Sequence, residues 1–507
     1  MMRSLPILLL TIAASALAQE CPSDYVEYFS KRNPPFSPGV YEYPYQRPSQ
    51  DCRTYNVDEI EKVIGRDMNK SISDPDLYRL FANTWPNTVD TTVKWTGYSD
   101  DNPDEELAFI ITGDINAMWM RDSSNQLQSY KSVLQDEKVA KLYRGAINLQ
   151  ARYMRKSPYC NAFQPPPESG IPPTFDHAEG DVVTPEYDPN FVFECKYEID
   201  SLAAFFQLSY DYYHATDDVN FFAKFSWKEA VRTILDVAKG LMAGTYAPDG
   251  SVNKSPYTWA RKSTASTETV ANRGTGEPVN GNIGLIRSFF RPSDDSCIFQ
   301  YFIPGNMMFA RYVRATADIM DTIDEGTAQE MRDIAQGIEH GIKEHAIVRH
   351  PKFGHVYAYE VNGYGSHSLM DDANLPSLLS IPHLGFKKNT DMVYRNTRDF
   401  ALSNWNPYFA HGPVINATGG PHLGPGMGWP MGVITQILTS DDDGEITTGI
   451  RQLMGSTSGL GLMHETVNSH DDTRWTRPWF AWTNGLFGQM ILDLADRKPH
   501  LLRKSYQ

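Results

Sequence analysis

The chain has 507 residues, of which 41% are hydrophobic and 21% charged, a balance typical of globular proteins. Its length allows several average domains or one large toroid or barrel with a substantial core. The formal net charge of −16 disfavours nucleic acid or an anionic membrane as a partner, because such partners select a basic face. A neutral substrate fits this charge best.

The N-terminus has the pattern of a secretion signal. Arg3 supplies a positive charge, residues 5–14 form a short apolar run, and the Ala-x-Ala sequence at 16–18 matches a cleavage site. The run is too short to span a membrane, and no later stretch is apolar enough to do so. We therefore expect residues 1–18 to be removed before Gln19 and the protein to be secreted, with retention in a cell wall left open.

Other features agree with export. Glycosylation sequons begin at Asn69, Asn253 and Asn416. The cysteines are Cys21, Cys52, Cys160, Cys195 and Cys297. Because their number is odd, at least one is free or paired with another chain. We expect Cys21–Cys52 to fasten the N-terminal arm and Cys160–Cys195 to close a loop. No Cys-x-x-Cys pair is present, which disfavours a zinc ribbon.

The order of segments predicts an arm followed by one helical domain. Residues 19–56 are rich in Pro, Tyr and Ser and are expected to lie over the main body as an extended arm. Helical periodicity follows near 57–68, 125–155, 202–213, 228–243, 306–322, 328–346, 391–402, 446–454 and 486–494. The strand signal is thin, with one small hairpin expected at 355–361.

Long connectors rich in Gly, Pro and Asn separate these helices. They cover residues 160–190, 263–284, 362–385 and 411–430. Ordered loops of this length in a compact domain are usually functional. No linker divides the body, so we predict a single catalytic domain over 57–507. Its fold class is all-α, a toroidal helical scaffold with long loops forming a pocket at one end and a few short strands.

The first candidate site segment is residues 111–123. Trp119 offers a flat apolar face for a sugar ring, and Arg121 and Asp122 could bind its hydroxyl groups. The competing interpretation makes Asp122 a helix cap paired with Arg121. Residues 196–201 precede the next helix, where Asp200 or Ser201 could serve as the cap. Glu198 lies in the loop before that helix and could face a pocket.

Two adjacent acidic pairs follow. Arg291 opens the run Arg-Pro-Ser-Asp-Asp that ends in Asp294 and Asp295, one carboxylate more than a helix cap needs. Crowded like charges raise one pKa, which suits a general acid near neutral pH, although such pairs also occur on solvated surfaces. Asp371 and Asp372 form a second pair that competes for this role. Calcium is conceivable at this second pair, but its spacing is not that of an EF-hand loop.

The last candidates are His464 and Glu465, after the apolar Leu462 and Met463. This lead-in indicates partial burial of Glu465, which would raise its pKa unless donors or cations offset the effect. The pair is not part of a His-Glu-x-x-His sequence, so a zinc protease is disfavoured. No Gly-x-Ser-x-Gly elbow and no Walker loop are apparent, which weakens esterase and NTPase interpretations.

At these motifs the chain resembles glycoside hydrolase family 125, the exo-acting α-1,6-mannosidases. The matching pieces are residues 113–115, 118–123, 197–201, 291–295, 370–374, 461–465 and 479–482. They occur in the family's order from about residue 57 to the C-terminus and are specific only jointly. The secretion signal, the arm and the sequons depart from the family pattern.

The resemblance implies an (α/α)6 barrel and inversion of anomeric configuration without a required metal or cofactor. It implies Glu465 as general base, an acid in the Asp294–Asp295 pair, and Arg121 with Asp122 in the terminal-sugar subsite. We therefore expect a secreted hydrolase of terminal α-1,6-mannose, with a neutral mannose-containing glycan as partner. The alternatives are a glucoamylase-like α-glycosidase, an inactive carbohydrate-binding protein and a calcium-dependent mannosidase.

Overall fold

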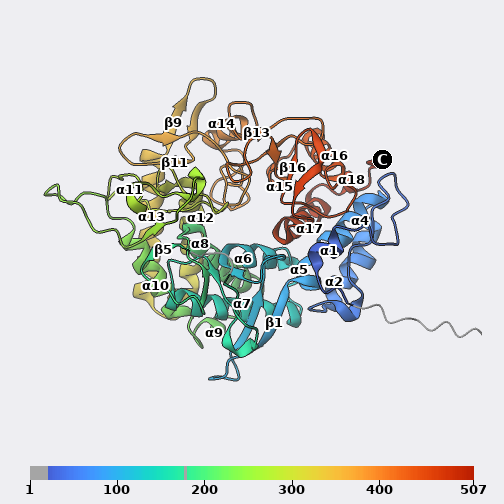
Figure 1. The fold of residues 1–507 in the computed structure, drawn as a ribbon, viewed down its shortest axis with the longest axis horizontal. Coiled ribbons are helices and arrows are strands. Elements are labelled where there is room, and N and C mark those ends of the chain that lie inside the picture. The colour runs from blue at the N-terminus through green and yellow to red at the C-terminus, as the bar shows by residue number, and fades with distance from the viewer. Residues whose placement is uncertain (1–20, 176–179) are drawn as a thin grey trace, which may run out of the picture.

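The computed structural model describes residues 21–175 and 180–507, so the predicted secretion signal lies outside the described residues. The chain forms an (α/α)6 toroid whose elements follow one another around a ring, as predicted (Figure 1). No helix in the described part of the chain is long and apolar enough to cross a membrane.

The helices are α1 (Tyr25–Phe29), α2 (Asp58–Lys62), α3 (Asn69–Ser71), α4 (Pro75–Thr84), α5 (Asn87–Thr91), α6 (Met120–Gln128), α7 (Glu137–Lys156), α8 (Ile199–Thr216), α9 (Val219–Phe222), α10 (Trp227–Gly240), α11 (Ala271–Gly274), α12 (Ile303–Asp321), α13 (Glu325–His345), α14 (Met392–Ala401), α15 (Pro430–Leu438), α16 (Asp443–Gly455), α17 (Ala481–Arg497) and α18 (Pro499–Leu502). The strands are β1 (Val93–Tyr98), β2 (Glu106–Ile110), β3 (Met118–Trp119), β4 (Ala162–Phe163), β5 (Val182–Thr184), β6 (Val192–Glu194), β7 (Thr258–Ala260), β8 (Tyr301–Phe302), β9 (Ile347–His350), β10 (Gly354–Tyr357), β11 (Glu360–Val361), β12 (His367–Ser368), β13 (Phe409–Ala410), β14 (Ala417–Thr418), β15 (Met427–Gly428), β16 (Thr466–Asn468) and β17 (Asp471–Thr476).

Burial distinguishes inner from outer helices. All nine residues of α6 are buried. On α13 the buried positions include Ala328, Met331, Ala335, Ile338 and Ile342, a single stripe at helical spacing that faces the core. Helices α6, α8 and α12 pack in succession, and α13 packs on α12. Buried side chains therefore surround the whole of α6, whereas on α13 they lie on one face.

The two ends of the chain close the ring. The C-terminal helix α17 packs against α4, α5 and α6, which come from the first third of the sequence. In Figure 1 the red and blue segments accordingly lie side by side. This contact brings residues near 480 next to residues near 115, and the cavity described below lies at that junction.

The helical patterns locate the long helices except α4 and α15, and one of the patterns is broken. The pattern over 125–155 divides into the end of α6 and most of α7. Asp136 caps α7, because its carboxylate accepts hydrogen bonds from the backbone N–H groups of Lys138 and Val139. The chain between the two helices forms a short 3-10 turn, Lys131–Val133.

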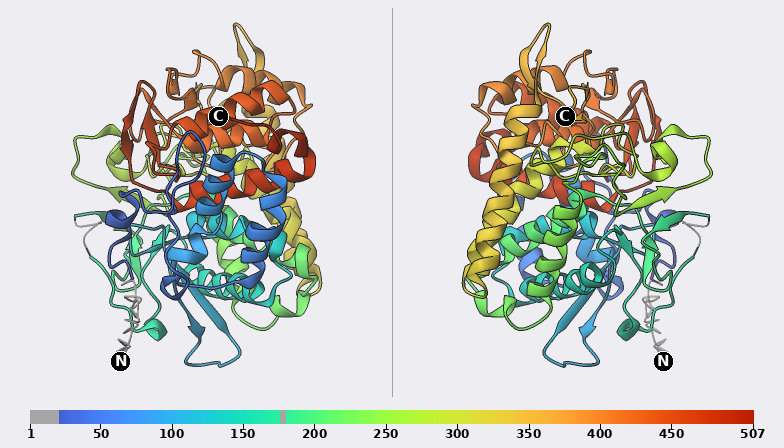
Figure 2. Two further views of the ribbon diagram at one scale, coloured as in Figure 1. Left: turned by 90° about the vertical axis from the view of Figure 1, so that its right-hand side faces the viewer. Right: turned by 90° about the vertical axis from the view of Figure 1, so that its left-hand side faces the viewer.

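The strands form small two- and three-stranded sheets in the described residues. The expected hairpin at 355–361 is wrong. Strand β10 pairs with the preceding β9, while β11 pairs with β8 and β12, so the segment contributes to two different sheets. The longest hairpin, β1–β2, projects from the body (Figure 2).

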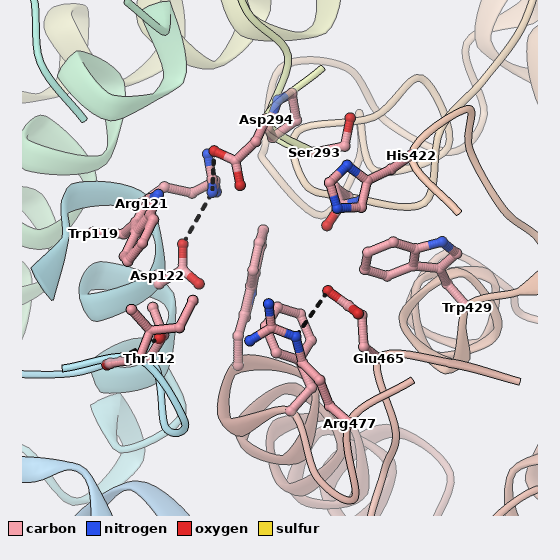
Figure 3. A pocket seen from close by; sticks show the side chains of 15 residues that line it. Thr112, Trp119, Arg121, Asp122, Ser293, Asp294, His422, Trp429, Glu465 and Arg477 are labelled. Carbon is pink, nitrogen blue, oxygen red and sulfur yellow. Dashed lines mark hydrogen bonds and ion pairs between the residues drawn. The ribbon is translucent and has the colours of Figure 1, made fainter. Parts of the chain in front are cut away.

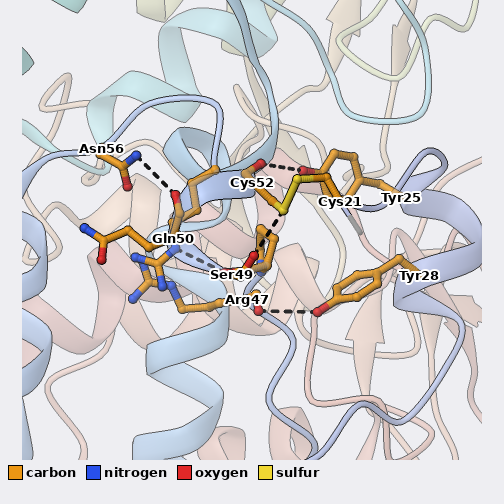
Figure 4. Close-up of a disulfide and its surroundings, with 10 residues drawn as sticks. Cys21, Tyr25, Tyr28, Arg47, Ser49, Gln50, Cys52 and Asn56 are labelled. Atoms are coloured by element: carbon orange, nitrogen blue, oxygen red, sulfur yellow. Dashed lines mark hydrogen bonds between the residues drawn. A yellow bond between two sulfur atoms is a disulfide. The ribbon is translucent and has the colours of Figure 1, made fainter. Parts of the chain in front are cut away.

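Both expected disulfides are present. Cys21–Cys52 and Cys160–Cys195 have Cα–Cα distances of 5.2 and 4.0 Å, and Cys297 is a free thiol. The first bond joins the ends of the N-terminal arm (Figure 4). Two disulfides are typical of proteins that mature in an oxidising compartment.

The arm packs onto the helical body through one aromatic contact and several hydrogen bonds. Phe29 is fully buried, and its ring centroid lies 4.7 Å from that of Trp479. Leu462 belongs to the same apolar cluster. The Nε2 group of Gln46 donates to the carbonyl of Leu460 at 3.0 Å. The arm therefore contacts the segments immediately beside Glu465 and Arg477.

Candidate active site

A cavity opens where the loops between the helices meet (Figure 3). The space between its walls, its open mouth included, is about 430 Å³. Its lining residues are Thr112, Ile115, Trp119, Arg121, Asp122, Pro292, Ser293, Asp294, Asn374, His422, Trp429, Glu465, Arg477, Phe480 and Trp482. Five predicted site residues are thus brought together, namely Trp119, Arg121, Asp122, Asp294 and Glu465.

One small antiparallel sheet positions three of the lining residues. Trp429 follows β15, Glu465 precedes β16, and Arg477 follows β17. In the observed register Gly428 pairs with Val467, and Thr466 pairs with Thr476. Neighbouring antiparallel strands run in opposite directions, so the end of β15, the start of β16 and the end of β17 meet at one edge. The three side chains therefore reach the cavity together.

Glu465 is held by its backbone and by a cation. Its N–H group donates to the carbonyl of Thr476 at 3.2 Å, and its Oε1 lies 3.3 Å from Nε of Arg477. The same guanidinium forms an ion pair with Asp114. Arg477 has a φ of +57°, a left-handed conformation that costs free energy for a residue other than glycine. Such strain is typical of functional sites.

The run at 291–295 forms a tight turn that separates its two aspartates. The N–H of Arg291 donates to the carbonyl of Asp295 at 2.8 Å, and the N–H of Asp294 donates to the carbonyl of Arg291 at 2.9 Å. Asp294 also has a left-handed φ, of +64°. Its side chain is 28% exposed and lines the cavity, whereas the Asp295 side chain is 2% exposed. Only Asp294 of the pair therefore presents its carboxylate to a ligand.

Asp295 binds two neighbours behind the wall. Its Oδ1 lies 3.0 Å from Nδ1 of His422, and its Oδ2 accepts a hydrogen bond from Ser293 at 3.2 Å. Burial lowers the pKa of His422, but the hydrogen bond and charge of Asp295, together with the charges of Asp294 and Glu465, raise it to about 9. The imidazole is therefore a cation at neutral pH.

Arg121 lies at the centre of a buried acidic cluster. Its guanidinium lies 2.6 Å from Glu198, 3.2 Å from Asp122, 3.5 Å from Asp200 and 3.9 Å from Asp294. Burial raises the pKa of Asp122 to about 6, although the charge of Arg121 opposes this shift. Asp122 is not the N-cap of α6; that position is occupied by Trp119, which makes no side-chain cap bond.

Asn161 links this cluster to Asp294. Its Nδ2 group lies 3.2 Å from Glu198, 3.3 Å from Glu194 and 3.4 Å from Asp294. Asn161 follows Cys160, and the pairing of Ala162 with Glu194 places it beside the strand that precedes Cys195. The second disulfide thus closes the wall that supports Asp294.

The remaining predicted site residues lie outside the cavity lining. His464 stacks on Trp475 with ring centroids 4.5 Å apart, and burial lowers its pKa to about 4. Arg291 forms an ion pair with Glu360 at 2.6 Å. Glu198 is buried against Arg121 as described.

The second acidic pair is also buried behind the wall. Asp371 accepts backbone hydrogen bonds from Leu378 and Leu379, at 2.8 and 2.9 Å. Burial raises the pKa of Asp371 to about 8. Asp372 accepts a hydrogen bond from the side chain of Asn374 at 3.0 Å, and Asn374 itself lines the cavity. The structure therefore places this pair in support of the wall rather than on it.

His422 and Trp429 are lining residues that the sequence did not single out. Both lie in the connector 411–430, whose length and Gly/Pro content marked it as functional without identifying a residue. Trp482 is buried, but its ring also faces the cavity, with the Arg121 guanidinium 5.6 Å from its centroid. Across residues 21–175 and 180–507, no three His, Cys, Asp or Glu side chains are grouped as a metal ion requires.

The geometry suits acid/base chemistry on a sugar. A carboxyl group from the 291–295 turn and a carboxylate from the β16 edge face one cavity, and aromatic rings line its wall. In Figure 3, Asp294 and Glu465 come from separate segments, with Arg121 and Asp122 on one side and His422 and Trp429 on the other. Most glycoside hydrolases use a pair of carboxyl groups that flank the glycosidic bond of the bound sugar.

Comparisons with known proteins agree with this chemistry. The Meiotically up-regulated gene 157 protein of Schizosaccharomyces pombe is 47% identical over 491 residues, covering 96% of this chain and 94% of that protein. A metal-independent α-mannosidase from Streptococcus pneumoniae, solved in a non-productive complex with α-1,6-mannobiose, is 30% identical. The two folds match with a TM-score of 0.78 over 87% of this chain and 99% of that one.

The family pattern described as "Metal-independent alpha-mannosidase (GH125)" matches residues 74–492. This stretch contains every residue of the cavity wall. It is a far larger share of the chain than the short motifs on which the resemblance was first based. The chain therefore belongs to glycoside hydrolase family 125, the metal-independent α-mannosidases.

Proposed function

We propose that the protein is an exported exo-acting α-mannosidase that removes terminal α-1,6-linked mannose from glycans with inversion of configuration. The observation that carries the proposal is the entry of Asp294 and Glu465 into one cavity from separate segments. The α-1,6 linkage is supported by the mannobiose bound to the Streptococcus pneumoniae relative.

In this mechanism Asp294 is the general acid and Glu465 the general base. Asp294 protonates the glycosidic oxygen while Glu465 takes a proton from a water molecule that attacks the opposite face of the sugar. Inverting enzymes keep the two carboxyl groups roughly 6.5–9.5 Å apart to admit that water. Asp295 is the weaker candidate for the acid, because both its oxygens bind other side chains and it is almost fully buried.

The terminal mannose is bound by the wall opposite Glu465. Arg121 and Asp122 present polar groups to its hydroxyls, and Trp119 presents an aromatic surface. Glu198 holds the Arg121 guanidinium from behind at 2.6 Å, so its role is to orient Arg121. The cavity lining does not include Arg291, Asp371, Asp372 or His464, so direct contact of these residues with sugar stays a prediction.

Export is part of the proposal. The two disulfides and the predicted signal at 1–18 both favour an oxidising compartment. Asn69 and Asn253 of the sequons are exposed, and Asn416 is half-buried. A neutral glycan of a glycoprotein is then the substrate class, in keeping with the negative net charge.

The test is proton NMR of the first product released from α-1,6-mannobiose. The anomeric signal of the β-anomer should appear first, which would establish activity, linkage and inversion together. Parallel assays on aryl α-mannoside and aryl α-glucoside should give turnover of the mannoside alone. Release of the α-anomer, or hydrolysis of the glucoside only, would contradict the proposal.

A further inference from the structure

The cavity wall contains a charged pair that acid/base hydrolysis does not require. Asp295 is buried next to the proposed acid, and His422 lines the cavity with its side chain 36% exposed. The two side chains come from loops 127 residues apart in sequence, yet Nδ1 and Oδ1 lie 3.0 Å apart. Ser293 holds the other oxygen of Asp295 at 3.2 Å. The carboxylate is therefore fixed in position to orient one imidazole.

We propose that Asp295 keeps His422 doubly protonated, so that His422 binds an oxygen atom of the mannose held in the cavity through Nε2–H. With Nδ1–H donated to Asp295, Nε2 is the nitrogen left for a ligand. A charged donor forms a stronger hydrogen bond to a hydroxyl than a neutral one. The inference rests on the proposed function, because it assumes a mannose in this cavity.

The charges facing His422 support its cationic state. Asp294 and Asp295 face it from the 291–295 turn, and Glu465 faces it from the start of β16. Arg477 stands beside Glu465, and Arg121 with Asp122 lies across the cavity. The wall combines the acidic side chains Asp122, Asp294 and Glu465 with the basic side chains Arg121, Arg477 and His422. Such a balance suits an uncharged sugar.

The sign of the pH dependence follows from the pKa of about 9. His422 is charged below pH 9 and neutral above it, so mannose should bind more weakly as the pH rises through 9. The experiment measures binding rather than rate, because mannose binding involves no proton transfer by the catalytic acid or base. Mannose is titrated into the full-length mature protein by calorimetry between pH 7 and 10.5.

The wild-type affinity should fall roughly five- to tenfold across this step, the difference between a charged and a neutral hydrogen bond. Asp295→Asn should move the step toward the ordinary histidine pKa of about 6.5. His422→Gln should remove the step and bind weakly at every pH. The control His470→Gln changes an exposed histidine outside the cavity and should behave as wild type.

NMR of labelled histidines gives a second measurement that does not depend on binding or turnover. The signal missing from His422→Gln identifies the residue, and its pKa should fall in Asp295→Asn. An imidazole pKa below about 7 in the wild type would overturn the inference. So would a binding step that persists in His422→Gln. If the protein hydrolyses α-1,6-mannobiose but its mannose affinity does not fall near pH 9, the inference alone is rejected. If the protein neither binds nor hydrolyses mannosides, the proposed function is rejected as well.

Discussion

Arg477 holds Glu465 from one side, with its Nε 3.3 Å from Oε1. Both residues flank the same pair of strands, and the backbone of Glu465 is bonded to Thr476. The carboxylate is thus positioned before any substrate arrives. Preorganisation of this kind is what a general base needs, because a misplaced base loses much of its effect.

Replacement of Glu465 by Gln should lower kcat for α-1,6-mannobiose roughly 10²–10⁴-fold, the usual contribution of a positioned base. Gln has nearly the same shape but cannot accept the proton of the attacking water. Circular dichroism and the thermal midpoint should stay close to wild type. Glu344→Gln, at an exposed position near the end of α13, is the matched control. Near-normal turnover by Glu465→Gln would exclude this residue as the base.

The two aspartates of the 291–295 turn should respond differently to the leaving group. Asp294→Asn should lower hydrolysis of mannobiose roughly 10²–10⁴-fold but should spare a dinitrophenyl mannoside, whose leaving group departs without a proton. Asp295→Asn should affect both substrates to a similar and smaller extent, because it acts through His422. The measurement is kcat/KM for both substrates. Selective rescue of Asp295→Asn by the activated substrate would reverse the assignment.

The N-terminal arm should contribute to activity as well as to stability. Phe29 is fully buried against Trp479, which lies two residues from Arg477. Phe29→Ala should reduce the free energy of unfolding by about 3–5 kcal/mol and lower kcat. Phe36→Ala, in the same arm but 48% exposed, is the control for urea unfolding and turnover. Unchanged turnover by a destabilised Phe29→Ala would show that the arm is only structural.

The free energy of unfolding should fall as the pH rises, because the stabilising proton on Asp371 is lost. Its pKa is raised to about 8 in the folded chain from an ordinary value of 3.8, so between these values the folded state retains a proton that the unfolded state has lost. The stabilisation is complete below pH 3.8 and is lost as pH rises toward 8, at up to ~1.4 kcal/mol per pH unit.

Asp371→Asn cannot titrate, so the difference in its free energy of unfolding between pH 5 and pH 8 should be smaller than in the wild type. Urea unfolding at both pH values measures this difference. The variant should be less stable overall, since the single amide oxygen cannot accept both backbone hydrogen bonds that the two Asp371 oxygens accept from Leu378 and Leu379. Equal differences in the two proteins would contradict the prediction. Asp249→Asn, at an exposed turn, is the control.

The outer helices could be predicted from the sequence because each has one solvent-exposed face, which leaves a periodic apolar pattern on the other. Helix α13 shows a clear apolar stripe, and its predicted bounds differ from the observed ones by a few residues. Helix α15 was missed. Seven of its nine residues are buried, with polar and small side chains among them, so no stripe marks one face. The hairpin at 355–361 failed because its two strands find different partners, which local alternation does not reveal.

The site could be predicted only where motifs marked it. Asp294 and Glu465 are 171 positions apart, and their meeting depends on ring closure, which no local pattern encodes. The sequence did not separate Asp294 from Asp295. The left-handed φ of +64° at Asp294, which turns its side chain into the cavity, separates them. His422 was missed because a single histidine in a Gly-rich loop belongs to no recognisable sequence motif.

The closure of the ring by α17 has a consequence for biosynthesis. Helices α4, α5 and α6 leave the ribosome hundreds of residues before the helix that covers them. The apolar surfaces that α17 covers therefore stay exposed until residue 497 has emerged, for most of the synthesis of the chain. A chain truncated before α17 would lack Trp482 from its cavity wall and would leave the ring open.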